Sequence, residues 1–296
     1  QVGNDIISIV MCNLFIFLSF ITFYGSVFFI AAIYLWLLFK RQFRFLFMLL
    51  PGLVLAGILI YPLFIQQLIN SKIALTEVKN WNLVLGQSNI KNLLLIPIKF
   101  SIGRISFDPQ IVYYSIAGLW TAFVFYFVIK GWKNTLFYLI GITITLAFLA
   151  SFFIPMLQYF RYLYLIPLIC LLLATTVKNT KIKWFILVGF TVFSFTYLLN
   201  PAHHREDWKS LVKNLNSNIV YMIPSSSDPV KYYNKNIEVR SLNQIGQDEL
   251  NNEIIVIPYT AEIHGVNYDE VLKSKSYELS SEKSYRELKI EIWNKK

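Results

Sequence analysis

The sequence predicts a membrane protein that is all-helical over residues 1–200, followed by a small soluble α/β domain at 201–296. Three observations predict this. The 296 residues are 56% hydrophobic and only 15% charged, and apolar runs recur from Ile6 to Leu199, as membrane spans do. After Pro201 the pattern changes to short strands and helical spacing. Residues 1–200 carry 14 lysines and arginines against three acidic residues, whereas 201–296 carry 13 against 14.

The predicted membrane region contains about seven spans. None of them contains Asp, Glu, Lys or Arg. Several are shorter than the roughly 20 residues that cross a bilayer without tilt, so their ends are approximate. The spans are expected at about 6–20, 25–39, 45–65, 111–129, 135–153, 162–177 and 184–199.

The connections between the spans predict the orientation. Three short connections are rich in lysine and arginine, and such loops stay in the cytoplasm. They contain Lys40, Arg41 and Arg44; Lys130 and Lys133; and Lys178, Lys181 and Lys183. The turn at 21–24, the long loop 66–110, the connection 154–161 and everything after Asn200 are then outside. We expect a multi-pass protein of the plasma (inner) membrane with an extracytoplasmic C-terminal domain. The net charge of +10 belongs to membrane flanks, and no nucleic-acid partner is expected.

Within the long outer loop, the stretch from Asn89 to Arg104 is apolar but interrupted. Lys91, Pro97, Lys99 and Gly103 break it, and it is too short for a span. A helix lying in the outer membrane interface, with its lysines toward the headgroups, fits this pattern.

The C-terminal domain shows the elements of a small α/β fold. Ser227-Asp228-Pro229 indicates the start of a helix, because proline favours the first helical position. The strand near the end alternates, which is typical of a strand at a sheet edge. The other predicted elements are a helix at Glu206–Leu215 and strands at Ile219–Ile223, Ile254–Ile257 and Lys289–Trp293.

Arg161 is the most informative single residue for function. It precedes an uncharged run and has tyrosines on both sides, and an arginine is costly at the bilayer centre. We therefore expect it at a membrane surface, where its planar donors suit a phosphate. A simple interface anchor has the same pattern, and both interpretations stay open. Lys99 and Arg104 are expected on the same outer face, either beside that phosphate or as nonspecific headgroup contacts.

Other chemical motifs are weak. Asp108 precedes Pro109 and fits a helix-starting turn better than a general base. The histidines lack the spacing of a zinc site. Cys12 and Cys170 lie in apolar runs and are expected to be buried. There is no dinucleotide or P-loop motif. The residues identify no metal site and no cofactor, with a divalent cation left open.

Three stretches, in order, resemble one family. Ser19–Gly25 (SFITFYG) resembles a short outer turn with a T-x-Y-G pattern, Gln158–Pro167 (QYFRYLYLIP) resembles an R-Y-L-x-x-x-x-P element, and Arg205–Trp208 (REDW) resembles the opening of a C-terminal domain. These patterns are similar to bacterial polyprenyl-phosphate-sugar glycosyltransferases of the GT-C fold. That family includes relatives of the protein O-mannosyltransferases and the lipid A aminoarabinose transferase.

The resemblance implies transfer of a sugar from a polyprenyl-phosphate donor to a lipid, glycan or protein acceptor at the outer face. Arg161 would hold the donor phosphate, with Arg104 and Lys99 as weaker candidates, and Tyr24 and Tyr162 would touch substrate. The family's carboxylate, in the first outer loop, has no counterpart here. The chain is therefore expected to be the C-terminal portion of such an enzyme, and no catalytic residue is assigned within it. The expected partners are the donor, membrane lipids and an unknown acceptor.

Two other classes remain as alternatives. One is a transporter or lipid-flippase subunit, and the other is a non-catalytic membrane assembly protein. Coupled transporters usually carry ionisable residues within their spans, and the seven predicted spans have none. The sequence therefore favours the transferase.

Overall fold

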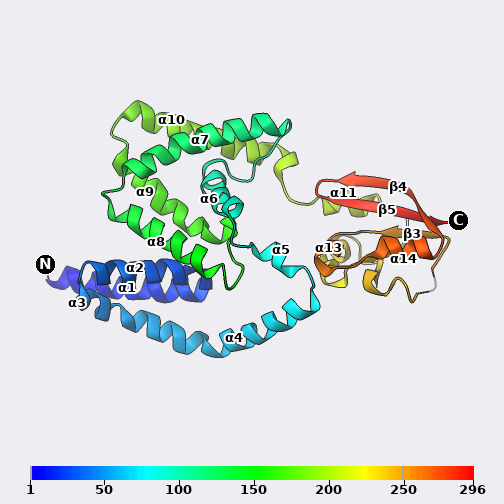
Figure 1. Cartoon of the computed structure of the whole chain (residues 1–296), viewed down its shortest axis with the longest axis horizontal. Helices are drawn as coiled ribbons and strands as arrows, with labels where there is room; N and C mark the ends of the chain where they lie inside the picture. Colours follow the sequence, from blue (N-terminus) through cyan, green and yellow to red (C-terminus); the bar gives the residue numbers. More distant parts are fainter. Residues whose placement is uncertain (1, 249) are drawn as a thin grey trace. The chain divides into compact units, whose positions relative to one another are not determined.

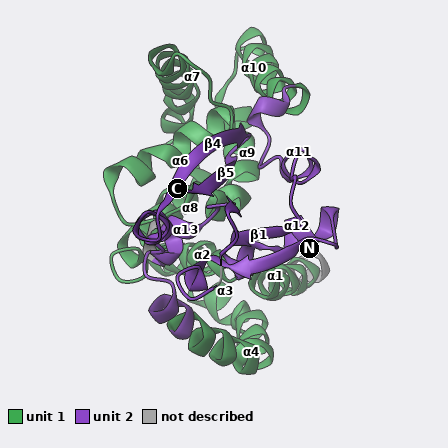
Figure 2. Ribbon diagram, turned by 90° about the vertical axis from the view of Figure 1, so that its right-hand side faces the viewer, with its two compact units in different colours: residues 1–72, 85–199 green, residues 73–84, 200–296 purple. Residues whose placement is uncertain are grey.

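The structure is a computed structural model, and it describes residues 2–248 and 250–296. The chain forms two compact units, traced in Figure 1 and coloured separately in Figure 2. One comprises residues 1–72 and 85–199 and is called the helical unit. The other comprises residues 73–84 and 200–296 and is called the sheet unit.

The first 199 residues are helical almost throughout. Two short 3₁₀ segments, η1 and η2, interrupt the α-helices. The elements are α1 (Val2–Thr22), η1 (Tyr24–Ser26), α2 (Val27–Phe39), α3 (Phe43–Met48), α4 (Leu50–Glu77), α5 (Trp81–Leu85), α6 (Ile90–Ile102), α7 (Gln110–Lys130), α8 (Thr135–Ala150), η2 (Tyr159–Leu165), α9 (Ile166–Thr176) and α10 (Thr180–Leu199).

These helices indicate a membrane protein. Four segments are long and apolar enough to cross a bilayer: Phe43–Glu77, Gln110–Lys130, Tyr159–Thr176 and Thr180–Leu199. Three shorter apolar helices cover Ile6–Thr22, Tyr24–Phe39 and Thr135–Ala150. Large apolar side chains such as Ile111 (81% exposed) and Phe153 (88%) point away from the unit. Exposed apolar surface on this scale marks a contact with lipid or with another apolar partner.

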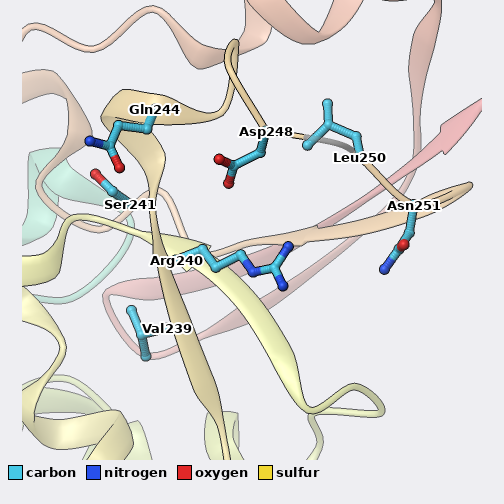
Figure 3. A pocket seen from close by; sticks show the side chains of 7 residues that line it. All are labelled: Val239, Arg240, Ser241, Gln244, Asp248, Leu250 and Asn251. Carbon is cyan, nitrogen blue, oxygen red and sulfur yellow. The ribbon is translucent and has the colours of Figure 1, made fainter.

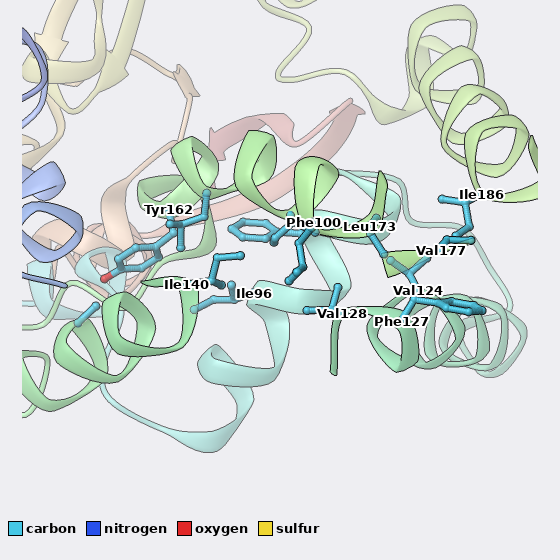
Figure 4. Close-up of a cluster of buried hydrophobic side chains, with 14 of the residues drawn as sticks. Ile96, Phe100, Val124, Phe127, Val128, Ile140, Tyr162, Leu173, Val177 and Ile186 are labelled. Atoms are coloured by element: carbon cyan, nitrogen blue, oxygen red, sulfur yellow. The ribbon is translucent and has the colours of Figure 1, made fainter. Parts of the chain in front are cut away.

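The core of the helical unit lies among α6, α7, α8, α9 and η2. Ile96, Phe100, Leu157, Tyr162 and Leu165 are all buried there, and Figure 4 shows part of the cluster. Helix α6 is thus present where the apolar stretch from residue 89 predicts a helix, and one of its faces packs against protein. Its relation to the membrane interface stays a prediction.

Two expectations about this unit are wrong. Helix α4 continues to Glu77, well past the expected end of the third span at residue 65. Residues 66–77 are polar enough to end an apolar run, yet many of them are good helix formers. Cys12 and Cys170 are exposed and not buried, because both lie on outward faces of their helices.

The sheet unit has a five-stranded mixed sheet in the order β2-β1-β3-β5-β4. β1 pairs in parallel with β2 and β3, and β5 pairs antiparallel with β3 and β4. The strands are β1 (Ile219–Met222), β2 (Glu238–Ser241), β3 (Glu253–Val256), β4 (Tyr277–Tyr285) and β5 (Leu288–Lys295). The α-helices are α11 (Trp208–Lys213), α12 (Asp228–Tyr233), α13 (Ala261–His264) and α14 (Tyr268–Ser274).

Alternation along the strands builds a core on each face of the sheet. Val220 and Met222 join one cluster with Trp208 of α11, whereas Tyr221 joins the other with Leu272 of α14. Successive strand side chains point to opposite faces, so helices on both sides bury both faces.

The sequence predictions for this unit are largely confirmed. Strands form at the two apolar runs near residues 219 and 254, and α12 begins at Asp228 with proline in its first turn. Helix α11 is shorter than the predicted Glu206–Leu215. The final strand exists, but its expected edge position is wrong, because β5 lies between β3 and β4.

Residues 73–84, from the expected outer loop, complete the sheet unit. The backbone N–H of Asn80 donates to the carbonyl of Ile263 (2.9 Å), and its side-chain amide donates to the carbonyl of Glu262 (2.7 Å). Both acceptors belong to α13. The segment that follows α4 is therefore docked on this helix.

Candidate functional site

Two of the resembling stretches, η1 and η2, meet in the helical unit. The hydroxyl of Tyr164 in η2 donates to the carbonyl of Gly25 in η1 (3.2 Å), although the residues are 139 positions apart in the chain. The Tyr164 ring also lies 6.2 Å from Phe23 and 6.3 Å from Phe29, measured between ring centroids. The fold thus joins the T-x-Y-G turn to the arginine-bearing segment.

The turn at η1 is built from local hydrogen bonds. The backbone N–H of Phe23 and the hydroxyl of Ser26 both donate to the carbonyl of Ser19, each at 3.0 Å. A Cβ at Gly25 would lie 2.3 Å from the Phe23 ring. Glycine is therefore required if the ring is to fold back over the turn.

The 3₁₀ geometry of η2 decides which way its side chains point. With three residues per turn, positions i and i+3 share a row. Tyr159, Tyr162 and Leu165 form one row, which packs into the core cluster. Arg161 shares the next row with Gln158 and Tyr164. Arg161 is therefore placed on the row whose Tyr164 contacts η1, and it is half-buried.

Arg161 has no carboxylate partner within the part of the chain that the structure describes. Its backbone N–H donates to the carbonyl of Gln158 (3.0 Å), which fixes the main chain. A half-buried guanidinium without an internal counter-ion is suited to an external anion.

Lys99 and Arg104 lie near each other on another side of η2. The Lys99 ammonium donates to the Tyr113 hydroxyl (3.2 Å) and to the carbonyl of Ile105 (3.4 Å). Burial lowers the pKa of Lys99, Tyr159 acts in the opposite direction, and the charge of Arg104 lowers it further. A second positive group beside a desolvated ammonium favours an anion at the same place.

The predicted site residues are therefore only partly brought together. Lys99 lies near both Arg104 and Tyr159, and Arg161 lies on the neighbouring row of the same 3₁₀ segment. Tyr24 is half-buried and packs against the rings of Phe20 (6.3 Å) and Phe64 (5.9 Å).

Tyr162 lies in the core. It is 1% exposed, and its hydroxyl donates to the carbonyl of Met156 (3.1 Å). In this conformation its side chain is closed to a substrate. Asp108 is exposed and directly precedes Pro109, the N-cap of α7, as expected for a helix-starting turn.

No family model, curated protein or solved structure matches this chain. The functional proposal below therefore rests on the geometry of the site and on the resemblance seen in the sequence.

Gly86 was not predicted from the sequence. This glycine contacts Leu157 and Gln158, the two residues that directly precede η2. Its carbonyl accepts from the backbone N–H of Leu157 (3.0 Å), and its φ is +86°. A Cβ there would lie 2.7 Å from Gln158 and 2.8 Å from the Leu157 backbone. The glycine in the turn sequence Leu85-Gly86-Gln87-Ser88 was the available signal.

The third resembling stretch, REDW, organises the start of the sheet unit. Asp207 caps α11, and the backbone N–H of Ser210, which donates to its carboxylate (3.1 Å), holds the pKa of that carboxyl below its ordinary value. Glu206 accepts from the Tyr259 hydroxyl (3.1 Å), and Trp208 packs edge-on against the same ring (5.0 Å). These contacts give the acidic pair a structural role.

The sheet unit has an open hollow of about 740 Å³ at the end of β2. Figure 3 shows Arg240 and Asp248 among its lining residues. The Arg240 guanidinium is paired with Glu238 (2.7 Å). Over the described residues, no three His, Cys, Asp or Glu side chains gather as a metal site would require.

A buried carboxylate in β5 was also overlooked. Glu291 is 3% exposed. It accepts from the Tyr268 hydroxyl and the Trp293 indole N–H (3.0 Å each), and the Lys289 ammonium lies 2.6 Å away. Every donor is internal, so this group stabilises the sheet unit and does not face a ligand.

Proposed function

We propose that the protein is an integral-membrane glycosyltransferase that transfers a sugar from a polyprenyl-phosphate donor to a lipid, glycan or protein acceptor. The observation that supports this is the packing of η2 on η1, which sets Arg161 without a described carboxylate partner on the row that meets the T-x-Y-G turn. A lipid-linked phosphate stays in the membrane plane and needs a cation at interface depth.

In this proposal, the seven apolar helices all span the plasma (inner) membrane. The lysine-rich connections lie in the cytoplasm and the sheet unit lies outside. Arg161 then lies at the outer surface. The sheet unit has balanced charge and paired side chains, and we assign it an accessory role at the acceptor side.

The proposed roles are unequal. Arg161 holds the donor phosphate through its planar donors. Lys99 and Arg104 add positive potential nearby, and the burial that lowers the pKa of Lys99 makes an anionic neighbour favourable. The catalytic carboxylate is the one that the resemblance places in the first outer loop, so none is assigned here.

The test is substitution of Arg161 in the full-length protein. Arg161→Ala removes a charge-assisted contact worth about 1.5–3 kcal/mol, so donor affinity should fall roughly ten- to over a hundredfold. Arg161→Lys should recover part of this, because an ammonium lacks the planar fork. Transfer of labelled sugar is measured in membranes matched for protein amount, across donor concentrations. Arg44→Ala, an exposed arginine at another helix end, is the matched control and should keep wild-type activity.

Wild-type transfer by Arg161→Ala at all donor concentrations would contradict the proposal. Equal activity of Arg161→Lys and wild type would indicate an interface anchor, since lysine anchors nearly as well.

A further inference from the structure

An apolar hollow lies in the helical unit, where the end of α2 meets the start of α8. Its volume is about 890 Å³, within the range of small-molecule pockets. Leu35, Trp36, Phe39, Tyr138 and Ile142 form its apolar wall. Neither η1 nor η2 contributes to it, so it is separate from the donor site proposed above.

Flat aromatic rings give this wall a defined surface. Trp36 stacks on Tyr138 with ring centroids 4.9 Å apart and an interplanar angle of 22°. Phe39 also stacks on Trp36, with ring centroids 6.2 Å apart. Such a wall offers an extended apolar contact for a hydrocarbon chain.

Two lysines lie at the rim of the hollow. The Lys40 ammonium is 4.8 Å from the Trp36 ring centroid, and the Lys133 ammonium is 5.5 Å from that of Trp132. The lining contains no acidic residue. An apolar wall with cations at one end matches an anionic amphiphile in both shape and charge.

We propose that this hollow binds an anionic glycerophospholipid, with an acyl chain along the aromatic wall and the headgroup phosphate between Lys40 and Lys133. Basic pockets between membrane helices bind such headgroups in this way. A second copy of the chain is a poorer occupant, since a symmetric contact would bring the same lysines together. The inference does not depend on the transferase activity, and its failure would leave that proposal standing.

The test uses the purified, delipidated chain in a neutral detergent. Native mass spectrometry measures retention of phosphatidylglycerol and of phosphatidylcholine with the same acyl chains. The wild type should bind one phosphatidylglycerol and prefer it over phosphatidylcholine. Each lysine near an anionic headgroup contributes about a fivefold change in affinity, so the pair Lys40→Ala and Lys133→Ala should lower phosphatidylglycerol affinity about thirtyfold. Phosphatidylcholine retention should not change.

Two further variants separate the wall from the charges. Tyr138→Ser should weaken both lipids and leave their ratio unchanged. The control pair Lys178→Ala and Lys181→Ala removes two exposed lysines from another basic connection and should bind as the wild type does.

Three results would overturn the proposal. They are equal retention of the two lipids by the wild type, an equal loss of preference in the control pair, and a dimer in the same spectra that Tyr138→Ser abolishes. The last result would assign the surface to a second copy of the chain.

Discussion

The two units handle positive charge differently. In the helical unit, Lys40, Lys99, Lys130 and Lys133 each lie over an aromatic ring. In the sheet unit, cations lie against carboxylates, as in Arg240 with Glu238, Lys273 with Asp269, and Lys289 with Glu282 and Glu291. An aromatic face orients a cation without neutralising it. These four lysines of the helical unit thus keep their charge without a carboxylate against them, whereas the sheet unit pairs its cations internally.

The largest expected effect is on the unfolding free energy of the sheet unit, and it tests the contacts between Glu291 and its internal donors. Glu291→Ala leaves the buried Trp293 indole N–H and the half-buried Tyr268 and Lys289 donors without their acceptor. Each hydrogen bond to a charged group contributes about 1.5–3 kcal/mol. The sheet unit should lose about 3–5 kcal/mol of unfolding free energy, because two of the three donors regain contact with water. Lys99→Met in the helical unit removes a cation that no described carboxylate balances, and should cost less than about 1 kcal/mol.

The measurement is chemical unfolding of both variants in detergent, with tryptophan fluorescence as the probe of the transition. Comparable losses in the two variants would show that the contrast between the units does not hold.

Two glycines give a smaller effect that sharpens the same comparison. Gly86 and Gly265 both have positive φ, +86° and +66°, so alanine is strained by about 1–2 kcal/mol at each. At Gly86 the new Cβ meets the Leu157 backbone at 2.8 Å, whereas at Gly265 it meets the flexible Lys79 side chain at 3.0 Å. Gly86→Ala should therefore cost about 2–4 kcal/mol, with the added cost of overpacking, and Gly265→Ala about 1–2 kcal/mol.

The same unfolding experiment distinguishes them. Because Gly86 packs against Leu157 and Gln158, which directly precede η2, Gly86→Ala should also weaken donor binding, and Gly265→Ala should not. Equal stability losses would mean that the backbone around Leu157 yields as easily as a lysine side chain.

The smallest expected effect is on the pH dependence of stability in the alkaline range. There Lys289 and Tyr268 contribute with the opposite sign to Lys99. In the sheet unit, a hydrogen bond to Glu291 raises the pKa of Lys289 above its ordinary 10.5, and burial raises the pKa of Tyr268 above 10.0. The folded unit then holds protons that the unfolded chain releases, so its stability is complete below pH 10 and falls as the pH rises further. Burial lowers the pKa of Lys99, so the contribution of this one lysine to stability increases as the pH approaches 10.5.

Single-tryptophan variants retaining Trp120 or Trp293 report the two units separately in this titration. Adding Lys99→Met to the Trp120 variant isolates the lysine, and an unchanged pH slope after this substitution would contradict its expected contribution.

Hydropathy and charge predicted the helical stretches well, because an apolar run must be either buried or in lipid. Hydropathy failed to predict the end of a helix where polar residues also have a high helix propensity. Residues 66–77 contain glutamine, lysine, alanine and glutamate, which favour a helix, so α4 extends beyond its apolar part. The missed strands β2 and β4 are rich in charged and hydroxyl side chains, and their exposed faces hide the alternation.

The candidate site was predictable only in part. Arg161 stands out because it is the only charged residue between Lys133 and Lys178 in the sequence. The contact of Tyr164 with Gly25 is set by tertiary packing, and no local pattern encodes it. Glu291 shows the opposite error, since a glutamate alternating with two isoleucines, Ile290 and Ile292, is expected to face solvent. Its burial depends on Tyr268, which comes from a different element.

The docking of Asn80 on α13 also affects the entropy of the whole chain. Residues 73–84 and 200–296 belong to one unit, so the intervening residues 85–199 form a closed loop whenever the sheet unit is folded. Closing a loop restricts the unfolded chain within it. The entropic cost of closure grows only slowly with loop length, by about 0.6 kcal/mol per doubling. The two amide contacts thus act as a noncovalent staple, and the folding of either unit limits the freedom of the other.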